Sequence, residues 1–235
     1  MDWIALFIIV GFSFMSMIIG FRHTSFEKGD FRKNIYYSLF GLLIIYLLVP
    51  KAFWFAPHEL WAPNSWILFE KESDLLSVII PIFTVHLILS FTPWAPYKRN
   101  ELKSRKEIMG FPVTMLPDNL KRMRSFAFDV AIAVVFEEFV FRLVLFYLLF
   151  ETLGMTGWWL IIISSLIFCM GHSYQGLKGL VGSFIIGIFL AISYIITESI
   201  WTPVILHLLN NATLIVYGVR RIRVMSDEQE RRIDD

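Results

Sequence analysis

The chain has 235 residues, of which 57% are hydrophobic, 17% aromatic and only 17% charged. Its mean hydropathy of +0.64 separates it from soluble domains, which are about half apolar and a quarter charged. The net charge of +1 provides no excess of cations for phosphates, and the single cysteine excludes an intramolecular disulfide, so nucleic-acid binding and a disulfide scaffold are both disfavoured.

The composition predicts an all-α fold, a polytopic bundle of transmembrane helices. A helix needs about 20 mainly apolar residues to cross a bilayer. Seven such segments follow one another, at residues 3–21, 34–50 with an extension over 52–57, 75–97, 120–150, 152–177, 179–197 and 199–219. We therefore expect about seven spans, with six and eight as alternatives. The first segment lacks a basic stretch before it and a small-residue cleavage site after it, which favours a retained span over a signal peptide.

The distribution of basic residues predicts the orientation. With seven spans, one side of the membrane collects eighteen Lys and Arg residues and the other only two, Lys51 and Lys71. Because basic loops remain in the cytoplasm, this bias predicts an external N-terminus and a cytoplasmic C-terminus.

We interpret 1–235 as a single membrane domain. It would comprise three accessory spans at 1–97, a basic cytoplasmic loop at 98–119, a four-helix catalytic core at 120–218 and a cytoplasmic tail at 219–235, of which 226–235 is a short solvated end. The compact length and short loops favour a multi-pass protein of the bacterial plasma membrane, with the endoplasmic reticulum as the alternative.

The fourth predicted span contains ionisable residues, which cost several kcal/mol inside a bilayer and usually have a function. Glu138 and Arg142 are four residues apart, so they lie one helical turn apart and can pair. Glu137 is rotated by about 100° from Glu138 and is free to face another helix. One interpretation is a purely structural charge pair beside a protonated glutamate. The other is that Arg142 fixes Glu138 while Glu137 activates water.

Two later spans carry potential partners. His172 follows Phe168 by one turn at the end of the fifth span, and His207 and Asn211 share one face of the seventh. Glu137 and His207 each lie thirteen residues from a cytoplasmic arginine, which places both about 20 Å deep. His172 is only six residues from Lys178, so a simple span count places it too near the surface.

Together these three patterns resemble a known family. Glu137-Glu138-x-x-x-Arg142, Phe168-x-x-x-His172 and His207-x-x-x-Asn211 are similar, in this order, to the three motifs of the CAAX prenyl protease and bacteriocin-processing (CPBP, Abi) intramembrane proteases. The resemblance covers about residues 120–218. It implies hydrolysis of a peptide bond within the membrane.

The resemblance also implies roles for individual residues. Glu137 and His172 would activate a water molecule, and His207 and Asn211 would stabilise the oxyanion. Arg142 would hold the motif in place, with Glu138 in support. Elementary chemistry agrees, because amide hydrolysis needs a base for water and donors directed at the developing negative charge.

A metal is the main mechanistic alternative. Glu137, His172 and His207 could supply three zinc ligands, and the family has often been described as metalloproteases. However, no H-E-x-x-H motif is present and Asn211 is a poor zinc ligand, so we favour a mechanism without a cofactor.

The expected partners are membrane lipids and a hydrophobic or lipidated peptide substrate, such as a CAAX-type C-terminus, a leader peptide or a bacteriocin. Two other functions remain as alternatives. One is a catalytically silent scaffold or sensor, and the other is a proton-coupled transporter that uses Asp129, Glu137 and the histidines as a relay.

Overall fold

The computed structural model describes residue 4 and residues 6–11, 106–108, 111–113 and 116–234. The spans predicted at 34–57 and 75–97, and most of the predicted basic loop, lie outside the described residues. Of the span predicted at 3–21, only residues 4 and 6–11 are described, and they are helical.

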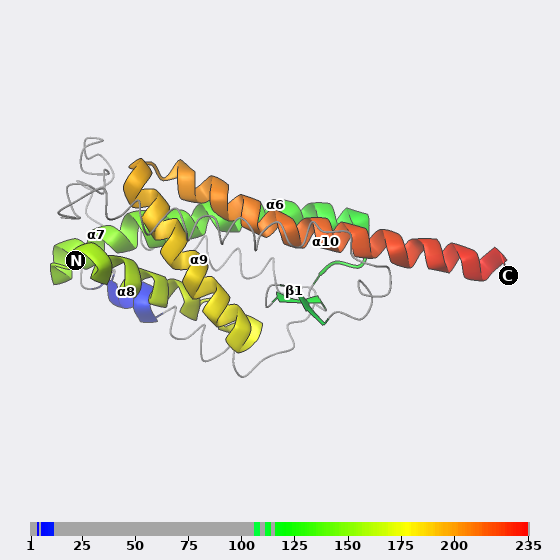
Figure 1. Ribbon diagram of the computed structural model, residues 1–235, viewed down its shortest axis with the longest axis horizontal. Coiled ribbons are helices and arrows are strands. Elements are labelled where there is room, and N and C mark those ends of the chain that lie inside the picture. The colour runs from blue at the N-terminus through cyan, green and yellow to red at the C-terminus, as the bar shows by residue number, and fades with distance from the viewer. Residues whose placement is uncertain (1–3, 5, 12–105, 109–110, 114–115, 235) are drawn as a thin grey trace.

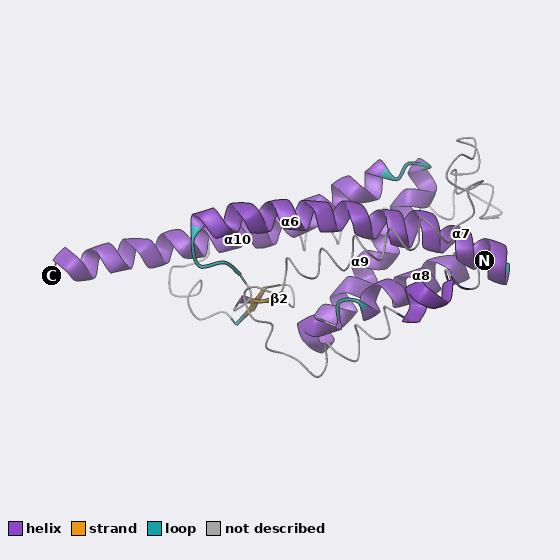
Figure 2. Ribbon diagram, turned by 180° about the vertical axis from the view of Figure 1, so that it is seen from behind, coloured by secondary structure: helices purple, strands orange, loops and turns teal. Residues whose placement is uncertain are grey.

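The described chain is helical apart from one short antiparallel hairpin, in which Ile108 faces Phe111 (Figures 1 and 2). The elements in order are β1 (Glu107–Ile108), β2 (Phe111–Pro112), α6 (Leu120–Glu138), the π-helix η5 (Phe139–Val144), α7 (Leu145–Leu153), α8 (Gly157–Met170), the 3₁₀ turn η6 (Ser173–Gln175), α9 (Gly176–Thr197) and α10 (Trp201–Asp234). The helical class predicted from composition is therefore confirmed for this part of the chain.

The helices α6, η5 and α7 follow one another without a break and correspond to the predicted fourth span. Asn119 caps the beginning, where its side chain accepts a hydrogen bond from the Arg122 amide at 2.9 Å. Gly154 ends the helix in a left-handed conformation with φ 62°, in which the Met155 amide bonds the Leu149 carbonyl. The π-helix begins directly after Glu138, and such widened turns occur often at functional sites.

The fifth predicted span, 152–177, is wrong in its extent. α8 has 14 residues and therefore a length of about 21 Å, well below the thickness of a hydrocarbon core of about 30 Å. After Met170 the chain turns through η6 and enters α9, and Gly176 provides the positive φ of 75° that this reversal needs. α8 therefore ends well before residue 177, the predicted end of this span.

The last helix, α10, is longer than predicted. Residues 226–234, expected to be a solvated end, continue the helix, and Figure 1 shows this part extending beyond the other helices. α10 runs antiparallel to α6 and lies beside it in both views (Figures 1 and 2). The shared core contains Met123, Val134, Tyr217 and Ile222. A β-carbon on Gly218 would collide with the end of the Met123 side chain, so glycine permits this close approach.

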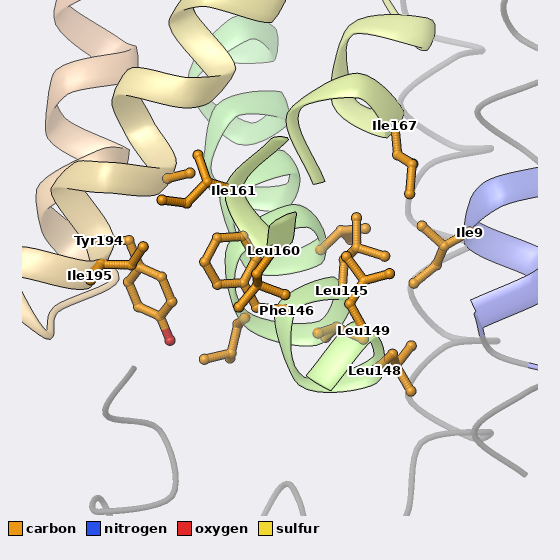
Figure 3. Packing of buried hydrophobic residues seen from close by; sticks show 14 of the residues in the cluster. Ile9, Leu145, Phe146, Leu148, Leu149, Leu160, Ile161, Ile167, Tyr194 and Ile195 are labelled. Atoms are coloured by element: carbon orange, nitrogen blue, oxygen red, sulfur yellow. The ribbon is translucent and has the colours of Figure 1, made fainter. Parts of the chain in front are cut away.

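A second core joins α7, α8 and α9. Figure 3 shows Phe146, Leu160, Ile161 and Tyr194 packed together, and all four are almost fully buried. Two described segments, Ser173–Thr197 and Trp201–Ser226, are long and apolar enough to cross a membrane, while α8 is apolar but shorter.

Candidate active site

The predicted pair between Glu138 and Arg142 forms at the centre of the helices. Arg142 Nε lies 3.2 Å from Glu138 Oε2, and both side chains are fully buried. Arg142 also donates through Nη2 to the Gly187 carbonyl on α9 at 3.1 Å. Its guanidinium lies 4.5 Å from the centre of the Phe168 ring on α8. Arg142 therefore ties the π-helix η5 to both α8 and α9.

The second oxygen of Glu138 has a partner that the sequence did not reveal. His207 on α10 approaches Glu138 Oε1 through Nδ1 at 2.7 Å. Because a carboxylate can only accept, this bond places a proton on Nδ1 and turns Nε2 towards Glu137. Glu138 thus orients the imidazole of His207, in addition to pairing with Arg142.

Glu137 is the point at which three separate segments meet. Its Oε2 lies 3.9 Å from His172 Nε2 and 3.8 Å from His207 Nε2. The depths estimated for Glu137 and His207 correctly predicted that these residues meet. His172 joins them because α8 ends early and its following turn lies at the same depth. We refer to Glu137, Glu138, His172 and His207 as the Glu–His cluster.

The histidine in the α8–α9 turn, His172, contacts a backbone carbonyl and two aromatic rings. The His172 Nδ1 donates to the Phe168 carbonyl at 3.2 Å, so the neutral ring has its lone pair on Nε2, which faces Glu137. The ring centre of Phe168 lies 4.6 Å away, and the ring of Tyr174 stacks at 6.2 Å with an interplanar angle of 27°. Tyr174 is a site residue for which the sequence offers no motif signal.

Phe168 has a wider role than its place in the motif suggested. Besides Arg142 and His172, its ring contacts His207 edge-on, with centres 5.9 Å apart. It also packs against Phe141. Phe168 is therefore the apolar centre around which the Glu–His cluster is arranged.

Asn211 lies one turn after His207, as predicted, and is half-buried. Among the described residues its one side-chain hydrogen bond comes from the Nδ2 of Asn210, which lies 3.4 Å from Asn211 Oδ1. The structure thus brings Glu137, His172 and His207 together and leaves the Asn211 amide nitrogen available to another group.

The distances from Glu137 to the two histidines are relevant to the binding of a water molecule and of a metal ion. Separations of 3.8 and 3.9 Å exceed a direct hydrogen bond but leave Glu137 and both histidines within reach of one water molecule. The carboxylate and imidazole donors have the chemistry of zinc ligands. However, within the part of the chain that the structure describes, no group of three or more His, Cys, Asp or Glu side chains is placed to hold a metal ion.

The close packing of α9 at the site leads to a testable prediction. A β-carbon on Gly187 would lie 3.2 Å from both Phe168 Cδ1 and Ser165 Cβ. We expect Gly187→Val to destabilise the protein by about 1–3 kcal/mol and to reduce any activity that depends on Phe168. Thermal unfolding in detergent would measure this.

Gly182 provides a matched control on the same helix. Among the described atoms, none lies within 4 Å of a β-carbon built there. Gly182→Ala should therefore raise the free energy of unfolding by about 0.5–1 kcal/mol through helix propensity. Equal stability of Gly187→Val and wild type would contradict the proposed packing.

Fold and site together define a class: a helical protein with two helices long and apolar enough to cross a membrane, in which two glutamates and two histidines from separate segments meet. A family model described as type II CAAX prenyl endopeptidase Rce1-like matches residues 120–213. The match falls within the segment over which the three motifs resemble the CAAX prenyl protease and bacteriocin-processing family, which confirms the resemblance there. Searches of the curated proteins and of the solved structures found no match.

Proposed function

We propose that this protein is an intramembrane endopeptidase that uses the Glu–His cluster to hydrolyse a peptide bond in a membrane-associated or hydrophobic peptide. The observation that carries the proposal is the convergence on Glu137 of two histidines, from the α8–α9 turn and from α10. All three residues lie within the Rce1-like segment.

In the proposed reaction, Glu137 is the general base. Its carboxylate takes a proton from a water molecule, and the water oxygen forms a bond with the carbonyl carbon of the substrate. His172, whose Nε2 lone pair faces Glu137, helps to orient that water molecule. When the C–N bond breaks, the proton held by Glu137 passes to the leaving amine nitrogen. Atoms and protons therefore balance without a covalent enzyme intermediate.

His207 and Asn211 are proposed to stabilise the oxyanion. Asn211 can donate through its Nδ2, since the hydrogen bond from Asn210 involves only the Oδ1 atom of Asn211. His207 can donate through Nε2 only when both ring nitrogens carry protons, since Glu138 accepts from Nδ1. One such donor typically contributes about 10²–10³ to the rate of acyl transfer.

We propose a mechanism without a metal, in which Glu137 and His172 act directly on water. This view rests on the residue chemistry, because Glu137 can act as a base and His172 presents an Nε2 lone pair towards it. Zinc held by Glu137, His172 and His207 is the alternative that the experiment below distinguishes.

The proposed setting is a cell membrane, with seven spans, an external N-terminus and a cytoplasmic C-terminus. The bias of basic residues and the two apolar helices Ser173–Thr197 and Trp201–Ser226 support it. The proposed substrates are a prenylated CAAX-type C-terminus, a leader peptide or a bacteriocin-like peptide.

Cleavage by the purified protein tests the proposal. Fluorogenic hydrophobic peptides, prenylated and unprenylated, would be incubated with wild type and with His172→Ala, each with and without a strong chelator. We expect wild type to cleave in the presence of chelator and His172→Ala to be inactive. Loss of wild-type cleavage on chelation, restored by zinc, would show that a metal is required. Absence of cleavage of every peptide would favour the scaffold or transporter alternative.

A further inference from the structure

The residue before Asn211 is also an asparagine, and it belongs to none of the three motifs. Asn210 is only 8% exposed, in a helix that is otherwise mainly apolar around it. Its Nδ2 donates to Asn211 Oδ1 at 3.4 Å. Its own Oδ1 is buried, and no hydrogen-bond donor among the described residues reaches it.

An unsatisfied buried carbonyl is a liability for stability. Leaving such a group without a partner is unfavourable, whereas an apolar side chain of similar volume would avoid the penalty. Asparagine at position 210 is therefore less favourable for the stability of the folded protein than an apolar residue of similar volume. Its single side-chain bond is to the residue that donates to the oxyanion in the proposed mechanism, and this connection suggests why asparagine is used here.

The direction of that bond determines which end of the Asn211 amide remains free for the proposed mechanism. A carboxamide has one acceptor end and one donor end. Because Asn210 donates to the oxygen of Asn211, the Asn211 Nδ2 is left to donate elsewhere. If the amide rotated by 180°, two NH₂ groups would face each other and the carbonyl oxygen would point towards the developing negative charge.

We propose that Asn210 is a positioning residue, which holds the Asn211 side chain in the orientation that donates to the oxyanion. The inference rests on the proposed function for its catalytic consequence. The structural part of the inference, that Asn210 fixes the orientation of the Asn211 amide, does not depend on any substrate.

Asn210→Leu separates this role from a structural one. The variant removes both the donor and the unsatisfied carbonyl, so we expect the unfolding temperature to stay the same or rise. We expect kcat to fall by about 3- to 10-fold, the worth of one ordinary hydrogen bond, while KM remains close to that of wild type. Ser183→Ala is the matched control, because Ser183 is equally buried at 8% and lies on α9. It should leave kcat unchanged.

A double-mutant cycle provides the stricter criterion. If Asn210 acts through Asn211, then Asn210→Leu should have no further effect on kcat in an Asn211→Ala background. Additive losses would overturn the proposal, as would a wild-type kcat in Asn210→Leu. Asn210→Gln, which keeps the amide donor, should recover part of the activity.

A second experiment tests the positioning role of Asn210 without an assay of cleavage. With selective ¹⁵N labelling of asparagine in the full-length protein in detergent, the side-chain amide signals of Asn210 and Asn211 can be assigned by substitution. We expect the Asn211 signals to shift in Asn210→Leu and to remain in place in Ser183→Ala. Unchanged Asn211 signals would overturn the positioning role even if a wild-type substrate is found. Shifted signals without cleavage by wild type would instead overturn the proposed function alone.

Discussion

Glu137→Gln is expected to reduce cleavage by about 10²–10⁴-fold, the usual contribution of a general base. Glutamine has nearly the same shape, but it cannot take a proton from water. Its effect on folding should be small, because Glu137 is a quarter exposed and its distances to both histidines are longer than a direct hydrogen bond. Initial rates with a peptide that wild type cleaves, together with thermal unfolding, would measure both quantities.

Asp129→Asn is the matched control for this prediction. It makes the same change from carboxylate to amide, on the same helix α6, two turns before Glu137. We expect cleavage to remain at the wild-type rate. Equal rates for wild type and Glu137→Gln would show that Glu137 is not the base. If both variants were equally impaired, a relay through several carboxylates would become the better explanation.

Arg142→Met should have the largest effect on stability. It leaves Glu138 buried with one fewer partner and removes the bond to the Gly187 carbonyl. Breaking a buried ion pair by removing one partner typically costs about 3–5 kcal/mol, because the remaining charge is uncompensated. Unfolding in detergent by heat or denaturant would measure the loss.

The chain contains an ion pair of the same spacing at the surface. Arg122 and Asp118 are also four residues apart and also 3.2 Å apart, but their side chains are 65% and 50% exposed. Arg122→Met should therefore change stability by less than about 1 kcal/mol. If Arg142→Met were as mild as Arg122→Met, the proposed role of the buried pair would be wrong.

Removing both partners tests whether Glu138 also acts on His207. Glu138→Leu/Arg142→Met leaves no uncompensated charge, so part of the lost stability should return. Cleavage should stay low, because His207 loses the carboxylate that holds its Nδ1. Recovery of both stability and cleavage would indicate that Glu138 serves only the ion pair.

The sequence was sufficient for features that depend on local helical spacing. Composition predicted the helices, and the four-residue spacing predicted the pair between Glu138 and Arg142. Counting residues from the cytoplasmic arginines placed Glu137 and His207 at one depth, and they lie 3.8 Å apart. These predictions succeeded because rise and rotation per residue are nearly constant in a helix.

Features that depend on where a helix ends, or on which side chains meet across helices, were decided by the tertiary structure. The early end of α8 places His172 beside Glu137, although a count along a full span put it nearer the surface. The contact between Glu138 and His207 joins residues 69 positions apart, and the bond from Arg142 to the Gly187 carbonyl joins residues 45 apart. No periodicity encodes such contacts, because they arise from the packing of α8, α9 and α10 around Phe168. The sequence by itself therefore determined the helical class and the spacing of candidate residues along each helix, and only the packing of helices decided how those residues meet.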